Sequence, residues 1–409
     1  MLRRVRSPLG RPLLTLFISG AHPVQRRQFV LSTAATLAAP AFLRNALAQE
    51  GGLSGKSLTI GCSAALSGPL AGFGTDLRQG AEAAIAQINA RGGVHGRALQ
   101  LHMVDDGYVP QRTIDNVKQM LGQGSAFALL SCVGTPNNTA ILPMVEEAGI
   151  PYVAPLTGAS SLRKNARSVF HVRASYTDEV QRLVQRLMGM GVKEIGIVFL
   201  DNAYGRELLE DANRALAAAG GKASVQAALA TDGKNLDAVV AQVDAVHPSA
   251  VLLVTAGAAT VPLVRGLRKV LPGVLMAGVL MAGVSASLTG DAYKQLGETG
   301  RGLAVTMVMP DPNKGKTAVV REYQAAMKVR GQQEFGLGSL EGYVNMRVLA
   351  EGLERAGSDP TRSKLRSALA GIRNWDMGGF VVDYSGQAPY VGSRYIDLGV
   401  LSSAGKFLA

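Results

Sequence analysis

The sequence predicts an α/β protein made of two doubly wound lobes, each with a parallel sheet covered by helices. From residue 57 onward, apolar runs of strand length alternate with amphipathic segments of helix length. Such alternation requires right-handed crossovers and buries a sheet on both faces. The 409 residues are too many for one small core and sufficient for two. Further elements after the second round predict that the chain crosses between the lobes more than once, which makes a cleft with a hinge.

The first round of alternation covers residues 57–157. Its helices have the 3.6-residue apolar period, and Gly92 follows the first of them, where glycine ends a helix. The expected strands are 57–66, 98–106, 127–134 and 150–157. The expected helices are 75–92, 113–124 and 139–149.

The second round begins near Arg173 and repeats this pattern. Its expected strands are 194–201, 224–230, 250–256 and 273–279. Its expected helices are 177–191, 205–221, 236–245 and 260–270. After residue 312 the tail adds helices at 317–331 and 339–357 and strands at 378–385 and 393–402.

The order of these elements predicts the extent of each lobe. We assign 52–174 plus 304–377 to the first lobe and 175–303 plus 378–409 to the second. The direct repeat VLMAGVLMAG at 274–283 lies in the second lobe. We interpret it as a local duplication that lengthens one strand or loop.

Residues 1–48 are typical of an export signal. Arg26 and Arg27 form a twin-arginine pattern, and the apolar run FVLSTAATLAAPAFL follows them. Ala46-Leu47-Ala48 supplies the small residues that a signal peptidase needs. Because the apolar run is short for a bilayer span, we predict a twin-arginine signal peptide cleaved near Ala48 rather than a membrane anchor. The mature protein is then expected in the periplasm.

The charge of the chain is concentrated in that signal. The formal net charge is +12, but residues 1–48 contain seven arginines and no acid. Without them, 35 basic residues face 30 acidic ones, which is a mild surface bias. Since no basic stripe is interleaved with aromatic residues, a nucleic-acid partner is not expected.

The glycine-rich stretch SGPLAGFG, residues 67–74, invites comparison with a phosphate-binding loop. Its glycine spacing departs from G-x-G-x-x-G, and Pro69 lacks the N–H that would face a phosphate. No lysine follows Gly74, so a P-loop is absent as well. Asp105 and Asp106 end the second strand, where a ribose-binding acid would lie, and keep the nucleotide alternative open. We favour a loop that forms one wall of a ligand cleft.

No pattern in the sequence indicates catalysis or metal binding. The five histidines are scattered, without H-x-x-x-H or Cys/His clusters. No G-x-S-x-G elbow is present, and Glu146 and Glu147 lie on one helix as a solvated pair. We therefore expect no catalytic residue, no metal and no cofactor.

Two cysteines remain after signal cleavage, Cys62 and Cys132. Both are expected near the carboxyl ends of neighbouring strands. An oxidising periplasm permits a disulfide, but adjacent parallel strands seldom offer its geometry. A bridge and two buried thiols therefore remain alternatives.

Polar loops that combine glycine with hydroxyl residues follow strands in both lobes. They are 67–74, 131–138 and 154–161 in the first lobe and 201–208, which contains Tyr204, in the second. Open α/β sheets bind ligands at this edge. Backbone N–H groups at helix starts, together with the Thr135 and Thr157 hydroxyls, suit a carboxylate. The alternative for each hydroxyl is that it only caps a helix.

Five segments carry a family resemblance through their order and spacing. They are SGPLAGFGTDLRQGAEAAIAQINARGGVHGRALQLHMVDD, VGTPNNTAILPMVEEAGIPYVAPLTGASSLR, VFHVRASYTDEVQRLV, IGIVFLDNAYGRELLE and SLEGYVNMRVLAEGLERAG. They strongly resemble the type I periplasmic solute-binding proteins, and more narrowly the leucine/isoleucine/valine-binding branch that serves ABC importers. The resemblance spans the chain from about residue 57 to its end. It implies two Rossmann-like lobes joined by a three-segment hinge that close on a small ligand.

The resemblance also implies which residues bind that ligand. An aromatic ring, here Phe73, lies over it, the loop at Val133–Thr135 holds its carboxylate, and Tyr204 closes from the second lobe. The full implied set is Ser67, Phe73, Val133, Gly134, Thr135, Leu156, Thr157, Gly158, Tyr176 and Tyr204.

The departures from the family concern the ligand's ammonium group. Amino-acid binders of this branch hold it with an acid from the second lobe. Around the corresponding strand this chain reads GVLMAGVLMAGVSASL, with no acid until Asp291. The loop TAGAAT, 255–260, lacks a second-lobe tyrosine as well. An ammonium without a charge partner is penalised in a dry cleft. We hypothesise that the ligand need not be an α-amino acid and that a small aromatic or aliphatic organic acid fits, with Asp201 as the alternative compensating acid.

We therefore expect the protein to be the periplasmic substrate-binding component of an ABC importer and not an enzyme. Its expected partners are a small carboxylate ligand and an ABC permease of the inner membrane, and it is expected to be a monomer. Two alternatives are a sensor that presents ligand occupancy to a membrane receptor and a secreted Rossmann oxidoreductase with a bound cofactor.

Overall fold

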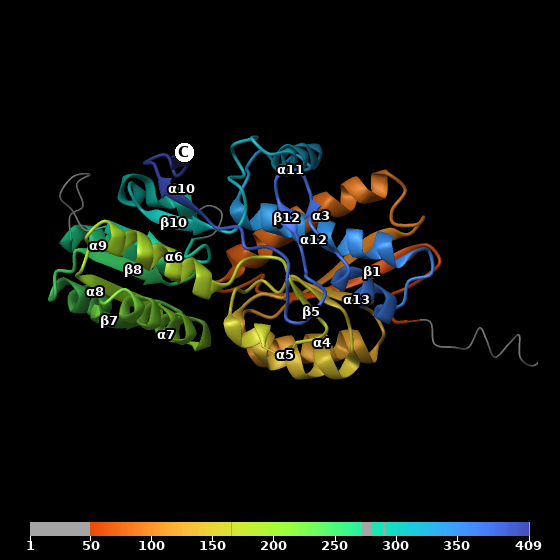
Figure 1. The fold of residues 1–409 in the computed structure, drawn as a ribbon, viewed down its shortest axis with the longest axis horizontal. Helices are drawn as coiled ribbons and strands as arrows, with labels where there is room; N and C mark the ends of the chain where they lie inside the picture. Colours follow the sequence, from red (N-terminus) through yellow and green to blue (C-terminus); the bar gives the residue numbers. More distant parts are fainter. Residues whose placement is uncertain (1–49, 165, 272–279, 289–291, 409) are drawn as a thin grey trace, which may run out of the picture. The chain divides into compact units, whose positions relative to one another are not determined.

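The computed structural model describes residues 50–408 except 165, 272–279 and 289–291 (Figure 1). The predicted signal peptide, the first part of the VLMAG repeat and Asp291 therefore lie outside the described residues. The strands are β1 (Ser57–Ala64), β2 (Ala98–Asp105), β3 (Ala128–Leu130), β4 (Tyr152–Val153), β5 (Val169–His171), β6 (Ile195–Leu200), β7 (Ala223–Leu229), β8 (Ala250–Val254), β9 (Leu280–Gly283), β10 (Ala304–Met307), β11 (Trp375–Asp376), β12 (Val381–Val382), β13 (Tyr390–Val391), β14 (Asp397–Leu401) and β15 (Phe407–Leu408).

The helices connect these strands. The α-helices are α3 (Ala71–Ala90), α4 (Pro110–Gly122), α5 (Thr135–Ala148), α6 (Tyr176–Gly189), α7 (Ala203–Ala218), α8 (Leu236–Asp244), α9 (Thr260–Val270), α10 (Ala292–Leu296), α11 (Ala318–Val329), α12 (Leu337–Ala356) and α13 (Arg362–Ala370). Short 3-10 helices are η1 (Ser160–Arg163), η2 (Gly257–Ala259) and η3 (Gly297–Gly300).

The first lobe is built on a parallel sheet with the order β13-β5-β4-β3-β1-β2. β1 pairs in register with β2, from Ser57 beside Ala98 to Ala64 beside Asp105. In Figure 1, α4 and α5 lie on one face of this sheet and α3 and α12 on the other. The carboxyl ends of β1, β3 and β4 consequently meet at one edge, which is where the polar loops begin.

The second lobe is built on a seven-stranded sheet with the order β15-β14-β10-β9-β8-β6-β7. The strands from β10 to β7 are parallel, whereas β14 is antiparallel to β10 and β15 is antiparallel to β14. The C-terminal tail thus adds an antiparallel edge to a parallel sheet. The predicted fold class, two doubly wound α/β lobes, is confirmed.

The chain crosses between the two sheets three times. It passes from β5 to α6, from β10 to α11, and from β13 to β14. The strand pairing differs from the predicted lobe boundaries at two places: residues 304–307 belong to the second sheet and residues 390–391 to the first. Short apolar strands carry the same pattern in either lobe, so the sequence did not show which sheet each of them joins.

Helices α3 and α12 cross at glycine contacts. A Cβ at Gly342 would lie 2.3 Å from the carbonyl oxygen of Leu77, and a Cβ at Gly80 would lie 1.7 Å from that of Ser339. No other residue type permits such a close approach of two backbones. The crossing therefore fixes the position of α12 on α3.

The two cysteines lie side by side in the core of the first lobe. Cys62 on β1 and Cys132 after β3 are both free and fully buried. The hydrogen bond between the two thiols and their burial raise the pKa of Cys62. Of the two alternatives left open by the sequence, the structure contains the pair of buried thiols.

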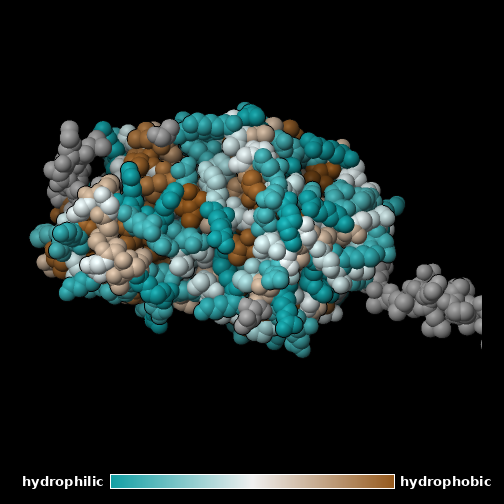
Figure 2. Space-filling view, viewed as in Figure 1, coloured by the Kyte–Doolittle hydropathy of each residue, from teal (hydrophilic) through white to brown (hydrophobic). Residues whose placement is uncertain are grey.

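The face of the molecule seen in Figure 2 is mostly hydrophilic, with hydrophobic residues gathered on the left, over the second lobe. Among the described residues, no helix combines the length and apolar character that crossing a bilayer requires. The same residues contain no group of three or more His, Cys, Asp or Glu placed to hold a metal ion.

Candidate ligand-binding site

A cavity lies between the two lobes, at the carboxyl ends of the strands. It contains about 770 Å³ of space between atoms, part of it open to solvent. Its apolar lining comes from both lobes and includes Leu70, Phe73, Leu156, Leu288, Val308 and Met309. An apolar cavity with a few polar groups is the usual form of a small-molecule site.

Seven of the ten predicted binding residues line this cavity, and three do not. Those that line it are Phe73, Val133, Gly134, Thr135, Leu156, Tyr176 and Tyr204. Ser67, Thr157 and Gly158 are absent from the lining and contribute in other ways.

Ser67 holds its own loop in place. Its hydroxyl donates to Asp105 Oδ2 at 2.6 Å, and the N–H groups of Leu66 and Gly107 donate to Asp105 Oδ1 at 2.7 and 2.9 Å. Although burial acts in the opposite direction, these donors lower the pKa of Asp105. Asp105, one of the two acids that kept the nucleotide alternative open, thus accepts hydrogen bonds from the loops around it.

Thr157 and Gly158 support residues that do line the cavity. The Thr157 hydroxyl is fully buried, 2.8 Å from that of Thr135, and accepts a hydrogen bond from Ala159 N–H at 3.2 Å. Gly158 leaves room for Tyr176, because a Cβ at this position would lie 2.8 Å from the tyrosine ring.

The start of α5 lies at the cavity, where Gly134 and Thr135 belong to the lining. Gly134 precedes the helix with φ of 99°, and no described side chain caps the first turn. A Cβ at Gly134 would lie 2.2 Å from the ring of Tyr108, so glycine is needed here for packing as well as for backbone conformation. The uncapped N–H groups of a helix start carry partial positive charge and accommodate a carboxylate.

Tyrosine side chains close the cavity from the second lobe. The rings of Tyr176 and Tyr204 meet edge to face with centroids 5.3 Å apart, and Tyr204 Oη donates to the carbonyl of Thr255 at 3.2 Å. Burial raises the pKa of both phenols, which remain neutral hydrogen-bonding groups at ordinary pH.

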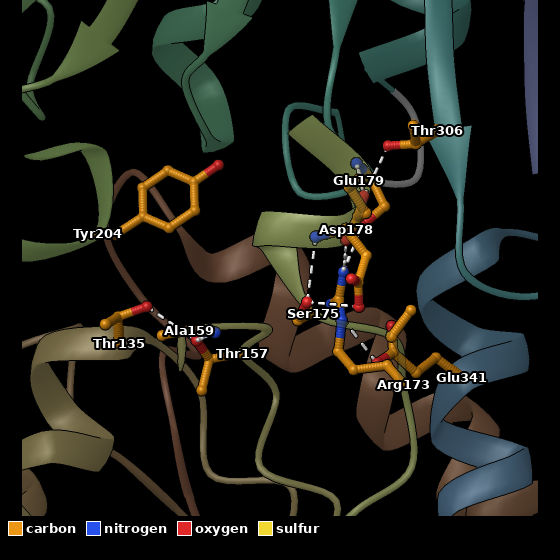
Figure 3. A network of polar contacts seen from close by, with 12 residues as sticks. Thr135, Thr157, Ala159, Arg173, Ser175, Asp178, Glu179, Tyr204, Thr306 and Glu341 are labelled. Carbon is orange, nitrogen blue, oxygen red and sulfur yellow. Dashed lines mark hydrogen bonds and ion pairs between the residues drawn. The ribbon is translucent and has the colours of Figure 1, made fainter. Parts of the chain in front are cut away.

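The largest feature that the sequence analysis missed is a buried ionic cluster beside these tyrosines (Figure 3). The Arg173 side chain, 4 % exposed, donates from Nη2 to Glu179 at 3.0 Å and from Nη1 to Glu341 at 3.5 Å. Glu179 also accepts hydrogen bonds from Ser285 N–H at 2.8 Å and from the Thr306 hydroxyl at 2.6 Å. Arg173 follows β5, Glu179 lies on α6 and Glu341 on α12, so the cluster joins both lobes.

Electrostatics distinguish the members of this cluster. Burial alone would lower the pKa of Arg173, but Glu341 and Glu179 raise it, so the guanidinium stays charged. Burial raises the pKa of Glu341, and Arg173 offsets only part of that effect. Among the described residues, Glu341 accepts a hydrogen bond from Arg173 alone, whereas Glu179 accepts from Arg173, Ser285 and Thr306.

Other polar residues that line the cavity were also missed. They are Asp76, Tyr108, Ser285, Tyr293 and Glu341, in addition to Arg173. Glu341 gave one usable signal, since it stands between Leu340 and Gly342 in a stretch of α12 whose neighbours are all buried. Tyr108 follows the carboxyl end of β2, the position that was used to choose the other loops.

The proposed compensating acid, Asp201, is not part of this site. Its carboxylate pairs with Arg206 at 2.6 Å on the surface, and its side chain is 50 % exposed. Asp201 directly follows β6, but its side chain is turned to solvent and does not line the cavity. Acids near the cavity come instead from α3 and α12 of the first lobe, as Asp76 and Glu341.

Contacts between the lobes surround the cavity. The N–H of Ala258 in η2 donates to the carbonyl of Pro69 at 2.9 Å, and Lys294 pairs with Glu334. Glu207 on α7 accepts hydrogen bonds from the N–H and hydroxyl groups of two serines that begin η1, Ser160 and Ser161, at 2.6–3.2 Å. The two lobes are thus held in contact in this structure.

Comparison with known proteins agrees with this architecture. Residues 57–388 match the periplasmic binding protein family. The chain is 25 % identical over 315 residues to Leu/Ile/Val-binding protein homolog 3 of Brucella melitensis biotype 1, which covers 76 % of this chain and 83 % of that protein.

Solved structures give the same result. A substrate-binding periplasmic protein from Ralstonia solanacearum is 31 % identical with a TM-score of 0.78, covering 86 % of this chain and 99 % of that one. A possible leucine/isoleucine/valine-binding protein from Rhodopirellula baltica SH 1 is 26 % identical with a TM-score of 0.78, covering 89 % and 98 %. The chain belongs to the periplasmic binding protein family, as a type I member of the branch that resembles the leucine/isoleucine/valine-binding proteins.

Proposed function

We propose that the protein captures a small carboxylate-bearing ligand, either an amino acid or an aromatic or aliphatic organic acid, in the cavity between its lobes. In this role it is the periplasmic component of an ABC importer and delivers the ligand to a permease in the inner membrane. The mature protein then acts in the periplasm, after export through the twin-arginine signal of residues 1–48, and is not an enzyme.

The observation that carries this proposal is the uncapped start of α5 at one end of an apolar cavity. The N–H and the hydroxyl of Thr135 supply donors for a carboxylate, and the lining from Leu70 to Met309 accommodates an apolar body. Micromolar affinity requires about 8 kcal/mol, which a few charge-assisted hydrogen bonds and a buried apolar group provide. The names of the Brucella and Rhodopirellula relatives support a ligand of this class.

Ligand binding also has to favour the closed arrangement if the protein is to signal occupancy to a permease. A ligand shifts the equilibrium between open and closed forms only by its differential affinity for the two. A molecule held by Thr135 of the first lobe and covered by Tyr204 of the second contacts both lobes only when they are closed.

A thermal-shift screen of amino acids and small organic acids tests the proposal, because a ligand that binds only the folded protein raises its Tm. Isothermal titration calorimetry then compares the best ligand on the wild-type protein and on Thr135→Val. We expect the variant to lose about tenfold in affinity for a carboxylate, equal to about 1.4 kcal/mol. Unchanged affinity, or the absence of any carboxylate ligand in the screen, would contradict the proposal.

A further inference from the structure

Tyr108 lies in the loop that follows β2, and it lines the cavity beside the start of α5. A Cβ built on Gly134 would lie 2.2 Å from Cε2 of the Tyr108 ring and 3.0 Å from Cζ, the carbon that carries the hydroxyl. Because the hydroxyl oxygen is bonded to Cζ, it also lies close to the first turn of the helix. Tyr108 therefore brings a hydroxyl to the end of the cavity where Thr135 offers donors to a carboxylate.

The backbone of Tyr108 has a conformation that few bulky residues adopt. Its φ is 65°, and the preceding Gly107 is also left-handed, with φ of 55°. A positive φ is unfavourable for a residue with a large side chain, and such outliers gather at functional sites. The loop adopts this conformation at the point where the tyrosine ring reaches the cavity.

Asp106 holds Tyr108 in this conformation. Its Oδ1 accepts a hydrogen bond from Tyr108 N–H at 2.9 Å. Its Oδ2 accepts from the hydroxyls of Ser63 at 2.8 Å and Thr113 at 2.9 Å. Since Asp106 is fully buried, these bonds attach Tyr108 to β1 and α4 in the core of the first lobe. The ring is thus positioned before any ligand enters, which reduces the entropy that binding would cost.

The Tyr108 hydroxyl makes no hydrogen bond to a described residue, and its oxygen is not among the atoms sealed from solvent. Tyr204 of the same cavity differs, because its hydroxyl already donates to the carbonyl of Thr255. Burial raises the pKa of Tyr108, and the nearby Tyr176 and Asp106 raise it further, so the phenol stays protonated. Tyr108 therefore has a neutral donor that a ligand in the cavity can reach.

The cavity offers a carboxylate no unoccupied cation. Among the described residues of its lining, Arg173 is the one positive side chain, and it already donates to Glu179 and Glu341. A carboxylate at the start of α5 must therefore be held by neutral donors, which have to replace several hydrogen bonds from water. Thr135 supplies an N–H and a hydroxyl, and the Tyr108 hydroxyl is the next donor along the same wall.

We propose that Tyr108 is a specificity-determining residue whose hydroxyl donates a hydrogen bond to the ligand's carboxylate. This inference rests on the proposed function, which places that carboxylate at Thr135. Hydrogen bonds from a neutral donor are stronger to an ionised acceptor than to a neutral one. Tyr108 consequently favours an acid over an uncharged analogue of the same shape.

Calorimetry on the wild-type protein and on Tyr108→Phe tests this contact. The probes are benzoate, hexanoate, leucine and phenylalanine, and the tightest of the four is compared on both proteins. We expect it to bind about tenfold more weakly to Tyr108→Phe, because phenylalanine keeps the ring against Gly134 and removes only the donor. The free energy of unfolding should not fall, since the hydroxyl bonds to no described residue.

Tyr343→Phe is the matched control. Tyr343 does not line the cavity, and its hydroxyl donates to Gln87 at 2.7 Å. Removing this hydroxyl should lower the free energy of unfolding and leave the affinity unchanged, which is the opposite pattern to that of Tyr108→Phe. Urea denaturation beside calorimetry therefore distinguishes a donor to the ligand from a residue that only supports the fold.

An uncharged analogue locates the contact on the ligand. The primary amide of the chosen acid competes with that acid on the wild-type protein and on Tyr108→Phe. We expect the amide to lose less than about threefold in affinity through the substitution, because its oxygen is a weaker acceptor than a carboxylate.

The outcomes separate this inference from the proposed function. Undiminished affinity in Tyr108→Phe would overturn the inference and assign the hydroxyl to solvent, with the proposed function intact. Equal losses for the acid and its amide would place the contact on another part of the ligand and overturn it as well. Failure of all four probes to bind overturns the inference, whereas the proposed function falls only when the whole screen yields no carboxylate ligand.

Discussion

Thr157 is buried outside the cavity, and its hydroxyl holds that of Thr135 at 2.8 Å. Thr157→Val removes this hydrogen bond without a large change in volume. We expect a loss of about 1 to 2 kcal/mol in the free energy of unfolding and a severalfold loss in ligand affinity, because Thr135 is no longer oriented. Urea unfolding and calorimetry measure the two effects.

Thr139→Val is the control for this variant. Thr139 is an exposed residue of α5, the helix that begins at Thr135, and its hydroxyl donates only to the carbonyl of Thr135. An equal loss of ligand affinity in both variants would show that the Thr135–Thr157 contact has no special role in binding.

Glu341 makes the free energy of unfolding depend on pH. Because burial raises its pKa in the folded protein, its contribution to stability is largest below the ordinary glutamate pKa of about 4.3 and is lost as pH rises through the raised value. Glu341→Gln should therefore unfold like the wild type at low pH and be more stable at neutral pH, by on the order of 1 kcal/mol.

Urea unfolding of both proteins between pH 4 and pH 8 checks this sign. A variant less stable than the wild type at neutral pH would mean that the Arg173–Glu341 pair is worth more than the cost of burying it.

At the scale of elements, the crossing of α3 and α12 determines the wall of the cavity that contains Phe73 and Glu341. Gly342→Ala places a methyl group 2.3 Å from the carbonyl of Leu77, so the helices must separate. We expect a loss of about 3 kcal/mol in the free energy of unfolding, measured by urea denaturation.

Gly122→Ala provides the comparison. Gly122 ends α4, and a Cβ there meets no atom within 4 Å. Its effect should be close to zero or slightly stabilising, since alanine restricts the unfolded chain. Similar losses at both positions would contradict the importance of the crossing.

Helices and strands with a long apolar periodicity were predicted well. Their ends were predicted poorly where contacts with distant residues determine the end of the element. The helix expected at 75–92 begins earlier, at Ala71, because Gly74 packs against the carbonyl of Ala65, where a Cβ would lie 2.2 Å away. The strand expected at 127–134 ends at Leu130, because the chain leaves the sheet at Ser131 with φ of 51°. Neither the packing of Gly74 on Ala65 nor the positive φ of Ser131 is indicated by a pattern in the neighbouring sequence.

The binding site likewise has one part that the sequence predicts and one part that it does not. Loops at the carboxyl ends of strands follow from the alternation of elements, and Val133, Thr135 and Leu156 do line the cavity. Arg173 and Glu341 are 168 residues apart in the sequence and meet only because α12 packs on α3 beside a crossover. Periodicity within either segment contains no information about that meeting.

At the scale of the whole molecule, Glu207 links the two lobes at the margin of the cavity. Its carboxylate accepts two backbone and two hydroxyl donors at the start of η1. Glu207→Gln weakens this contact in the closed form. We expect about three- to tenfold lower ligand affinity, mainly through faster dissociation, with little change in the free energy of unfolding.

Stopped-flow displacement and calorimetry measure the rate and the affinity. Glu210→Gln on the same helix is the control, since Glu210 faces solvent near Arg214. An unchanged dissociation rate in Glu207→Gln would mean that this contact does not restrain opening.

Arg173 lies on the first of the three segments that connect the lobes, between β5 and α6, and Thr306 precedes the second. When two bodies swing about such connections, points near the fulcrum move least and points at the rim move most. The Arg173–Glu179 ion pair therefore changes little during such a swing. η1 is tied to the same connection, because Arg163 donates to the carbonyls of Arg173 and Ala174. The moving lobes are thus joined at the pivot by buried polar contacts that opening need not break.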